Sequence, residues 1–276
     1  MPPSTSVQDF QDIVTSSDRI LALCGAGLSA ASGLPTFRGA GGLWRNHDAT
    51  ALATPDAFED DPALVWLFYA WRRHLSLTVE PNAGHYALAE LAKKKENFLC
   101  LSQNVDGLSP RAGHPEDKLR LLHGSLFDIK CFDECGYIEK NNHKDPLCPA
   151  LEPASSVNSS AAGSGGSHKL PLLDPKNPVP KIDVKKDLPH CPQCKHGLLQ
   201  VDAWVRRGPI ALMLVIGTGA QVYPAAGYVG RAKRMGARVA VINPDPESAE
   251  GLDDRDFFFQ SDAAEILPQL FSKALA

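Results

Sequence analysis

Four short apolar runs recur along the chain, and each one ends in a turn rich in glycine or polar residues. They span residues 20–24, 98–102, 212–216 and 239–242. Continuous apolar runs of this length are typical of strands buried on both faces of a parallel sheet. Between them, helix-like stretches cover residues 62–76, 84–95 and 225–235. The alternation predicts an α/β fold, a doubly wound parallel Rossmann-like sheet whose ligands bind at the carboxyl ends of the strands.

The composition excludes some classes of function but does not identify the function. The 276 residues are 43% hydrophobic and 22% charged, as in an ordinary globular protein with a sizeable core. The formal net charge of −4 argues against a dedicated nucleic-acid-binding domain, which is usually basic. The longest apolar run, residues 210–216, is far shorter than the ~20 residues of a membrane-spanning helix. We therefore expect neither nucleic acid nor a membrane as a direct partner.

Two close pairs of cysteines delimit a second, smaller module. Cys131 and Cys135 stand at its start, and Cys191 and Cys194 stand at its end. Two such thiolate pairs favour one structural zinc ion, with all four positions taken by sulfur and none open for catalysis. Unligated thiols or a disulfide are the alternatives. The remaining cysteines are expected to be a spare thiol of the module and two buried thiols on core strands: Cys148, Cys24 and Cys100.

The cysteine pairs also set the predicted domain boundaries. We predict a Rossmann-like domain over residues 1–124 and 198–276, and a zinc-binding module over residues 125–197. Within the module, residues 153–189 are rich in Ser, Gly, Pro and Lys and contain no Phe, Trp, Tyr or Cys. Such a segment has too little apolar surface to offset the entropy lost on ordering, so we predict a flexible insert there.

The turn after the first run reads Gly25-Ala-Gly-Leu-Ser-Ala30 and satisfies the pattern G-x-G-x-x-G/A. Bare backbone in such a turn lets a pyrophosphate approach the amides at a helix start, although glycines also occur in purely structural turns. A dinucleotide-binding dehydrogenase would place an acidic residue at the end of a second strand ~20 residues later. Here a loop over residues 32–39 follows instead, and Asp48 lies beyond it without a preceding strand. A dehydrogenase is therefore disfavoured.

The continuation of this turn, together with later motifs, resembles the sirtuins, a family of NAD-dependent protein deacylases. The first motif, over residues 25–39, reads Gly-Ala-Gly-Leu-Ser-Ala-Ala-Ser-Gly-Leu-Pro-Thr-Phe-Arg-Gly. The later ones follow in the family's order: Gln103-Asn-Val-Asp106, His123-Gly124, Gly217-Thr218, Asn243-Pro-Asp245 and Asp262-Ala263. The resemblance covers nearly the whole chain outside the insert. It implies NAD as the cofactor, acylated lysine proteins as substrates, and nicotinamide, free lysine and O-acyl-ADP-ribose as products.

The resemblance also implies roles for individual residues. Phe37 would shield the nicotinamide ribose, Arg38 would reach a phosphate or the ribose, and Gln103 would hold the ribose. Asn104 and Asp106 would form the pocket for the nicotinamide carboxamide, a group that needs both a donor and an acceptor. The residues implied for the diphosphate are Ala26, Gly27 and Ser29, and those for the adenosine half are Thr218, Asn243 and Ala263. The other motif residues assigned to NAD are Gly25, Thr36, Gly217, Gly219 and Asp245.

His123 is the residue that the resemblance makes the general base. In the family's mechanism the acyl-lysine carbonyl oxygen attacks C1′ of the nicotinamide ribose, and nicotinamide leaves. The histidine then deprotonates a ribose hydroxyl, which attacks the resulting imidate, and water releases the products. An imidazole, with an ordinary pKa near ~6.5, suits that proton transfer at neutral pH.

Residues 52–55 and 68–73 resemble the acidic-acyl branch of the family, the desuccinylases, demalonylases and deglutarylases. In that branch a tyrosine and an arginine three residues apart bind the acyl carboxylate, and a small alanine leaves room for it. The resemblance gives these roles to Tyr69, Arg72 and Ala53. Tyr69 and Arg72 share a helix face, and a guanidinium with a phenol suits a carboxylate in an apolar pocket. The alternative places Tyr69 in the core and Arg72 in solvent.

Departures from the family's pattern follow Cys194. The strand and Phe-Gly-Glu loop that pair with the backbone of the substrate peptide are missing before Gly217. Gly219 stands in place of a serine, and Ser261 in place of a glycine. The sequence therefore predicts a deacylase impaired for peptide substrates. The alternative is a non-catalytic protein that binds NAD or ADP-ribose without turnover.

The first nineteen residues bear on the expected compartment. Residues 1–19 contain a single arginine, several acidic side chains and no apolar stretch, unlike a secretory signal or a transit peptide. We expect the cytoplasm or the nucleus, with the mitochondrion as the alternative that the acidic-acyl branch suggests. A monomer is the expected oligomeric state.

Overall fold

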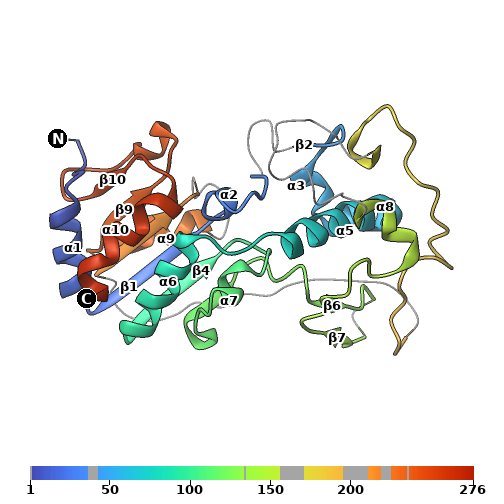
Figure 1. Ribbon diagram of the computed structural model, residues 1–276, viewed down its shortest axis with the longest axis horizontal. Coiled ribbons are helices and arrows are strands. Elements are labelled where there is room, and N and C mark those ends of the chain that lie inside the picture. Colours follow the sequence, from blue (N-terminus) through green and yellow to red (C-terminus); the bar gives the residue numbers. More distant parts are fainter. Residues whose placement is uncertain are drawn as a thin grey trace. The chain divides into compact units, whose positions relative to one another are not determined.

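The computed structural model describes residues 2–36, 43–133, 135–155, 171–194, 211–218, 225–234 and 236–276. The chain divides into two compact units (Figure 1). The sheet unit comprises Met1–Leu34, Glu80–Ser125 and Val201–Ala276, and the cysteine unit comprises Pro35–Val79 and Leu126–Gln200. The domain boundaries predicted from the sequence place residues 35–79 in the Rossmann-like domain. Here they cluster with the cysteine unit, because their apolar residues share its core.

The sheet unit is built on six strands in the order β10-β9-β8-β1-β4-β5, and every pairing is parallel. Cys24, the last residue of β1, lies opposite Ile216 of β8 on one side and Ser102 of β4 on the other. The carboxyl ends of these three central strands therefore meet at one edge of the sheet. The strands are β1 Arg19–Cys24, β4 Asn97–Ser102, β5 Leu119–Leu121, β8 Leu212–Ile216, β9 Arg238–Ile242 and β10 Phe257–Phe259.

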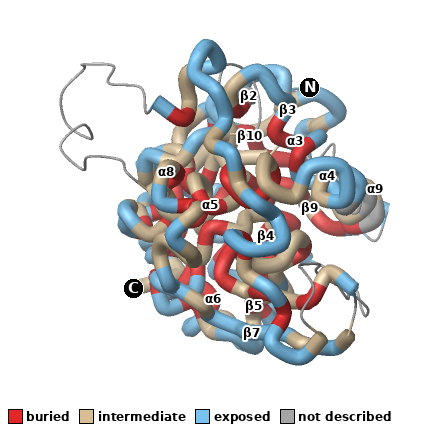
Figure 2. Tube along the Cα trace, turned by 90° about the vertical axis from the view of Figure 1, so that its right-hand side faces the viewer, coloured by how far each residue is buried: buried red, intermediate tan, exposed pale blue. Residues whose placement is uncertain are grey.

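Helices cover both faces of this sheet (Figure 1). On one face Ile216 shares a core with Leu91 of α6 and Phe271 of α10, and on the other Val241 shares a core with Ala232 of α9. In Figure 2 the buried residues follow strands such as β9 and β10. This arrangement confirms the predicted doubly wound α/β fold. The helices are α1 Val7–Ser16, α2 Gly27–Ala30, α6 Ala83–Lys94, α7 Leu108–Arg111, η2 Glu116–Lys118, α9 Ala225–Arg234, η6 Pro246–Ala249 and α10 Ala263–Leu275.

The four apolar runs correspond to β1, β4, β8 and β9, and each strand lies within one residue of its prediction. The three predicted helices are α5, α6 and α9, again with small shifts at their ends. The pattern did not indicate β5 or β10, because a strand of three residues is too short to show a period.

Side-chain caps explain where two helices of the sheet unit begin. Ser6 caps α1 by accepting a hydrogen bond from the backbone N–H of Asp9 at 3.2 Å. Asp262 caps α10 by accepting from the backbone N–H of Ala264 at 2.7 Å. Such caps satisfy donors that have no partner within the first turn of a helix. The two helices pack on the same face of the sheet through their apolar side chains, such as Phe10 of α1 and Phe271 of α10.

The cysteine unit is organised around the long helix α5, Pro62–Thr78. Leu67 and Phe68 of α5 are fully buried and share a core with Trp44, Leu151 and Ala154. The rings of Trp44 and Phe68 meet edge to face, with centroids 5.6 Å apart. The shorter elements of this unit are β2 Leu43–Trp44, β3 His47–Asp48, α3 Ala49–Leu52, α4 Pro55–Asp60, β6 Ile129–Lys130, β7 Ile138–Glu139, η3 Pro149–Leu151, α8 Glu152–Ser155 and η5 Pro171–Leu173.

Arg73 of α5 connects this helix to the segment that carries the first cysteine pair. Its buried guanidinium donates to the carbonyl oxygens of Leu126, of Asn142 at 2.8 Å and of Lys144 at 3.0 Å. Burial lowers the pKa of Arg73, and the carboxylate of Asp145 opposes that shift. A buried guanidinium that satisfies several backbone acceptors at once is a structural group.

Parts of the predicted flexible insert pack against the core of the cysteine unit. Leu172 and Leu188 are 4% and 6% exposed and belong to the same apolar cluster as α5. Arg45 donates to the carbonyl oxygens of Leu172 and, at 2.6 Å, of Asn177. The prediction of flexibility over residues 153–189 did not foresee these contacts, because isolated leucines in a polar segment show no pattern. The serine- and glycine-rich stretch, residues 156–170, lies outside the described residues.

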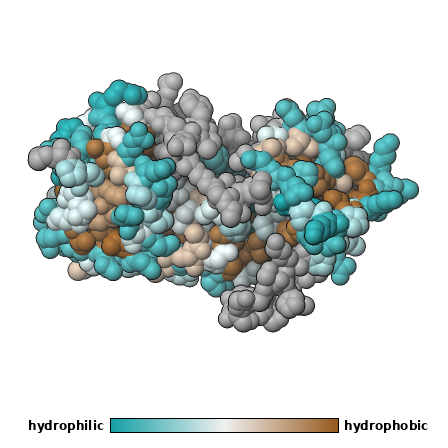
Figure 3. Space-filling view, turned by 90° about the horizontal axis from the view of Figure 1, so that it is seen from above, coloured by the Kyte–Doolittle hydropathy of each residue, from teal (hydrophilic) through white to brown (hydrophobic). Residues whose placement is uncertain are grey.

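No helix in the described part of the chain is long and apolar enough to cross a membrane. On the face seen in Figure 3, hydrophilic and hydrophobic residues are interleaved over the described surface of each unit. The large hydrophobic side chains that stand exposed in the described ranges are Tyr86, Ile138, Val179 and Val184.

Candidate functional site

The glycine turn after β1 packs directly against the end of β8. The backbone N–H of Gly25 donates to the carbonyl of Ile216, and that of Gly27 donates to the carbonyl of Gly217, both at 2.9 Å. A Cβ on Gly27 would lie 2.7 Å from Cα of Gly217, and one on Gly25 would lie 2.5 Å from Cβ of Thr218. The close approach of two backbone segments therefore requires these glycines. This is the structural role that the sequence left open beside phosphate binding.

The carboxyl ends of β4 and β8 are joined by a side-chain hydrogen bond. Nε2 of Gln103 donates to Oγ1 of Thr218 at 2.9 Å, and both residues are half-buried. The backbone N–H of Gln103 donates to the carbonyl of Cys24, the last residue of β1, at 2.9 Å. Two residues from separate motifs of the predicted NAD site thus meet at the edge where ligands of doubly wound sheets bind.

His123, the predicted general base, lies at the same edge. Its Nδ1 is 2.9 Å from the backbone carbonyl oxygen of Gln103. A carbonyl oxygen only accepts, so Nδ1 carries the proton, and in the neutral ring Nε2 is left with a lone pair. His123 is half-buried, and its Nε2 makes no hydrogen bond to any residue that the structure describes. This geometry presents Nε2 as a base.

Ser29, Asn104 and Asp106 form one hydrogen-bonded network, in which Ser29 and Asp106 are buried and Asn104 is half-buried. The hydroxyl of Ser29 donates to Oδ2 of Asp106 at 2.7 Å, and Oδ1 of Asp106 accepts from the backbone N–H of Leu108 at 2.9 Å. Nδ2 of Asn104 donates to the hydroxyl oxygen of Ser29 at 3.2 Å and to the carbonyl of Gly25 at 2.9 Å. The two N–H groups of Asn104 are thereby used within the protein, so this side chain presents its Oδ1 as the remaining polar atom.

His85 also belongs to this network, although none of the sequence motifs implies a role for it. It is 1% exposed, and its Nε2 lies 3.4 Å from the hydroxyl oxygen of Ser29. Burial lowers the pKa of His85 to about 4, against the opposing charge of Asp106. The signal in the sequence was the capping pattern Asn82-x-x-His85 at the start of α6, which places this ring near the turn after β1.

The residues predicted for the adenosine half follow β9 and β10. Oδ1 of the half-buried Asn243 accepts from the backbone N–H of Asp245 at 3.1 Å. Asp245 is exposed and caps η6 by accepting from the N–H of Glu247 at 3.0 Å. Ala263 is buried at the start of α10. The side chains of Asn243 and Asp245 therefore already have roles in shaping this turn.

Some of the predicted site residues are not brought together with the others. Phe37, Arg38 and Gly219 lie outside the described residues, as does the segment 195–210, where the family's peptide-pairing strand is missing. Thr36 is half-buried, and it belongs to the cysteine unit. Roles for these residues stay predictions from the sequence.

Tyr69 and Arg72, predicted for the acyl group, lie on α5 and are both half-buried. The guanidinium of Arg72 stacks over the ring of Phe68, 5.5 Å from its centroid. Burial raises the pKa of the Tyr69 phenol, and the charge of Arg72 partly offsets the shift, so the phenol keeps its proton as a donor. Tyr69 packs against the core of the cysteine unit, as the alternative expects, whereas Arg72 is half-buried rather than fully solvated. A role of the two residues in acyl binding stays a prediction. Ala53 is exposed just after α3.

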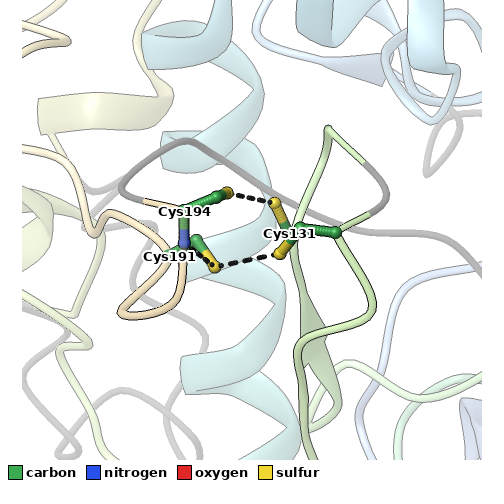
Figure 4. Close-up of side chains that lie close together, drawn as sticks. Cys131, Cys191 and Cys194 are labelled. Atoms are coloured by element: carbon green, nitrogen blue, oxygen red, sulfur yellow. Dashed lines mark hydrogen bonds between the residues drawn. The ribbon is translucent and has the colours of Figure 1, made fainter.

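The four cysteines of the two pairs converge in the cysteine unit. Their Sγ atoms all lie within 4.8 Å of one another, with Cys131 and Cys194 at 3.1 Å and Cys135 and Cys191 at 3.5 Å. Figure 4 shows the sulfurs of Cys131, Cys191 and Cys194 turned toward one another. Four thiolates at ~2.3 Å from a tetrahedral zinc ion stand about 3.8 Å apart, so the donor set fits zinc.

The state of these thiols supports the same assignment. None of these four described cysteines is joined in a disulfide. Although burial acts to raise the pKa of the Cys191 thiol, the backbone N–H groups of Cys194 and Gln193 lower it to about 6. Thiolate, the form that binds metal, thus predominates on Cys191 at neutral pH. The cysteines expected outside the cluster behave as predicted: Cys24 and Cys100 are buried, and Cys148 is a half-buried thiol.

Comparison with known proteins gives a consistent result. The Sir2 family model matches residues 25–224. An NAD-dependent protein deacylase of Candida albicans is 44% identical over 95% of both chains. The mitochondrial NAD-dependent protein deacylase sirtuin-5 of Canis lupus familiaris is 35% identical over 97% of this chain and 85% of its own. A crystal structure of a Sir2 homologue in complex with NAD matches with a TM-score of 0.73 at 28% identity, over 100% of this chain and 98% of that one.

These findings define the class of protein first: an α/β protein with a dinucleotide-type glycine turn and a cluster of four cysteines whose donor set fits zinc. The matched model covers more than half of the chain, and the relatives extend over nearly all of it. The chain belongs to the Sir2 family, and its fold and NAD-dependent enzyme class agree with the resemblance seen in its motifs.

Proposed function

We propose that this chain is an NAD-dependent protein-lysine deacylase that prefers acyl groups ending in a carboxylate. The observation that carries the proposal is the orientation of His123. Its Nδ1 is held by the carbonyl of Gln103 at the carboxyl edge of the sheet, and its Nε2 is left as a base. The relatives named NAD-dependent protein deacylases at 35–44% identity support the reaction. Their names leave the acyl group open.

In this proposal each part of the cofactor site has its own residue chemistry. When bound, NAD supplies a ribose C1′ that can be attacked, with nicotinamide as the leaving group. The half-buried turn at Ala26 and Gly27 offers bare backbone to the diphosphate. Oxygens of Asn104 and Asp106 accept from the nicotinamide carboxamide. Nε2 of His123 takes a proton from a ribose hydroxyl.

The fit of the site to NAD rests on its donor set. Gln103 and Thr218 bring an amide and a hydroxyl to the carboxyl edge of the sheet, a pair suited to ribose hydroxyls. Asp106 is 8% exposed and keeps free lone pairs on both oxygens, since each accepts one hydrogen bond. Such a site holds a polar ligand by several oriented groups rather than by net charge.

The acyl preference rests on α5. Tyr69 and Arg72 are one helical turn apart on this helix, and both are half-buried among aromatic side chains. A guanidinium in a partly desolvated setting pairs strongly with a carboxylate, and a protonated phenol adds a second donor. A neutral acetyl group carries no carboxylate to accept from these donors. Succinyl, malonyl or glutaryl lysine is therefore the proposed substrate.

The substrates, the oligomeric state and the compartment are also part of this proposal. Acylated lysine proteins are the proposed substrates, without direct contact to nucleic acid or membrane and with a monomer as the working unit. We retain the cytoplasm or nucleus as the expected compartment. The sirtuin-5 relatives are named mitochondrial, which makes the mitochondrion the competing location.

The test measures nicotinamide release from NAD with matched acetyl-lysine and succinyl-lysine peptides. Wild type is expected to prefer the succinyl peptide, and Arg72→Met is expected to abolish that preference. Lys140→Met, which removes an exposed positive charge from the same unit, is the matched control and should leave the preference intact. A preference for acetyl-lysine in wild type would refute the acyl assignment.

A second candidate, a protein that binds NAD or ADP-ribose without turnover, is favoured by the missing peptide-pairing strand between Cys194 and Gly217. It predicts that neither peptide releases nicotinamide while NAD still raises the melting temperature. That combination of results would replace the deacylase proposal by the binding one.

A further inference from the structure

A hairpin turn in the cysteine unit carries an arginine at a position that favours glycine. β2 and β3 pair antiparallel, with Trp44 opposite His47. Arg45 and Asn46 are the two residues of the turn between these strands. The first residue of such a turn needs a positive φ, which glycine, asparagine or aspartate usually supplies. Arg45 has φ 58°, so its backbone is strained and its side chain needs a compensating role.

The side chain of Arg45 holds a loop of the insert, which begins at Pro171 and ends at Asn177. The guanidinium donates to the carbonyl oxygen of Leu172 and, at 2.6 Å, to that of Asn177. The loop is also closed on itself, because Asn177 donates from Nδ2 to the carbonyl of Pro171 at 2.9 Å and from its backbone N–H to that of Asp174 at 3.1 Å. The two donors of one planar guanidinium thus hold both ends of the insert loop.

The insert loop is seated on the core that also supports α5. Leu172 is buried and belongs to the same apolar cluster as Trp44 and Phe68, and Tyr69 packs against that cluster. Trp44, the residue before Arg45, meets the ring of Phe68 edge to face. The hydrogen bonds of Arg45 and the packing of its neighbour therefore tie the hairpin, the insert loop and α5 together.

Phe68 connects this packing to the residue proposed for the acyl carboxylate. The guanidinium of Arg72 lies over the ring of Phe68, one helical turn further along α5. Trp44 packs against the same ring, so a displacement of the hairpin would displace the surface on which Arg72 rests. A long side chain meets a carboxylate in a fixed geometry only where neighbouring side chains restrict its rotamers.

We propose that Arg45 is a positioning residue for the acyl site: by holding the insert loop it fixes the packing around Phe68, and thereby the orientation of Arg72 toward the acyl carboxylate. The inference rests on the proposed function, because it takes Arg72 as the residue that binds the carboxylate. It gives part of the insert, whose composition predicts flexibility, a role in the choice of substrate.

Substitutions in the turn separate this role from the formation of the hairpin. Arg45→Gly removes both hydrogen bonds to the insert loop, yet glycine suits the positive φ and relieves the turn of strain. Arg45→Lys keeps the charge but replaces the planar fork by a single ammonium group. Asn46→Gly, at the exposed neighbouring position, is the matched control because it leaves the guanidinium in place. If Arg45 served the turn alone, Arg45→Gly would match or exceed wild type.

Limited proteolysis tests the hold on the insert loop without reference to activity. Trypsin cleaves after lysine, and the Lys176–Asn177 bond lies inside this loop. Cleavage there requires the loop to open. Arg45→Gly should be cut at this bond about tenfold faster than wild type or more, with Arg45→Lys in between and Asn46→Gly unchanged. Cleavage after Lys181, beyond the loop, is the internal reference.

The second measurement is the ratio of kcat/KM for the succinyl-lysine peptide to kcat/KM for the acetyl-lysine peptide. Arg45→Gly should lower this ratio about threefold to tenfold, because a less oriented guanidinium loses part of its charge-assisted hydrogen bonding to the carboxylate. Asn46→Gly should keep the wild-type ratio. In an Arg72→Met background, Arg45→Gly should lower the ratio no further, because the guanidinium that it positions is already absent.

Equal tryptic cleavage of wild type and Arg45→Gly would overturn the proposal, and so would an unchanged succinyl-to-acetyl ratio in this variant. A further fall of the ratio in the Arg72→Met background would show that the effect does not pass through Arg72, and would overturn it as well. Failure of the proposed function appears in wild type itself, as no turnover of either peptide or a preference for acetyl-lysine. That result would remove the acyl role of Arg45 too, while the cleavage rates would still show whether Arg45 holds the insert loop.

Discussion

The backbone carbonyl of Gln103 accepts a hydrogen bond from Nδ1 of His123 at 2.9 Å, while the side chain of the same glutamine donates to Thr218 at 2.9 Å. One residue at the end of β4 thereby sets the tautomer of the imidazole and places a polar group beside it. Because the carbonyl belongs to the backbone, the ring orientation does not depend on the identity of the Gln103 side chain. The imidazole of His123 and the carbonyl that orients it both lie at the carboxyl edge of the sheet.

This relationship predicts how His123→Ala behaves. Removing the base should lower kcat/KM for deacylation by about 10²–10⁴-fold, the usual contribution of a positioned general base. NAD binding should remain within a few fold of wild type, because the Gln103 carbonyl loses its hydrogen bond from His123 while the Gln103 side chain keeps its hydrogen bond to Thr218. Calorimetry for NAD and steady-state kinetics with the succinyl peptide measure the two quantities. His47→Ala, at an exposed position, is the control. Equal rates for wild type and His123→Ala would refute the assignment.

Gly217 predicts a large effect on stability that does not depend on the cofactor. It has φ +59°, and a Cβ there would lie 2.5 Å from the backbone nitrogen of Leu28. An alanine must therefore adopt a left-handed conformation and also displace backbone atoms. Gly217→Ala should lower the free energy of unfolding by about 2–4 kcal/mol, as measured by urea denaturation.

The matched control is Gly230→Ala in α9. A Cβ at this position meets only the end of the Arg234 side chain, at 3.4 Å, in a helix where alanine is favoured over glycine. This substitution should raise the free energy of unfolding by up to ~1 kcal/mol. Opposite signs for the two substitutions are the expected outcome. Two changes of the same sign and size would contradict the close packing between the turn after β1 and the end of β8.

The sheet could be predicted from the sequence because each central strand has a recognisable local pattern of residues. β1, β4, β8 and β9 are continuous apolar runs that end in turn residues, and their positions were found to within one residue. The grouping of residues 35–79 with the cysteine unit depends instead on long-range packing. Trp44 and Leu188 are far apart in sequence and give no local sign that they share a core. A residue pattern shows the periodicity of hydrophobic positions within one segment, and it does not show which distant segments pack together.

For the candidate site, too, the sequence predicts what short motifs contain and does not predict contacts between elements. Motifs located His123, Gln103 and the cysteines, because each is a short pattern with a chemical meaning. The sequence does not indicate which group donates and which accepts in the hydrogen bonds of the site. The side chain of Ser29 faces Asp106. His85 reaches the same network because it lies in the first turn of α6. Such roles arise where two elements meet, and no spacing rule within one element contains them.

The cysteine cluster predicts one zinc ion per chain. Chelation, or Cys135→Ser, should remove the metal and destabilise the chain by about 3 kcal/mol or more, because structural zinc sites contribute to folding directly. For a chain of this size that corresponds to a fall of about 6–12 °C in melting temperature. Elemental analysis and thermal unfolding give the two readouts. Cys148→Ser changes a half-buried thiol of the same unit outside the cluster, and it should retain full zinc content.

His85 predicts a specific pH dependence of stability. Burial lowers its pKa from 6.5 to about 4 in the folded state, whereas the unfolded chain protonates it near 6.5. Between these values the unfolded state binds more protons, so the free energy of unfolding rises with pH. The stabilisation is fully present above pH 6.5 and is lost as the pH falls toward 4, with a total on the order of 3 kcal/mol.

The quantity to measure is the difference in free energy of unfolding between wild type and His85→Gln, since glutamine does not titrate and all carboxylates are common to both. Urea denaturation at closely spaced pH values should show wild type losing stability relative to the variant across this window. A constant difference from pH 7 to pH 4 would show that His85 titrates alike in the folded and unfolded states and is not held neutral beside Ser29.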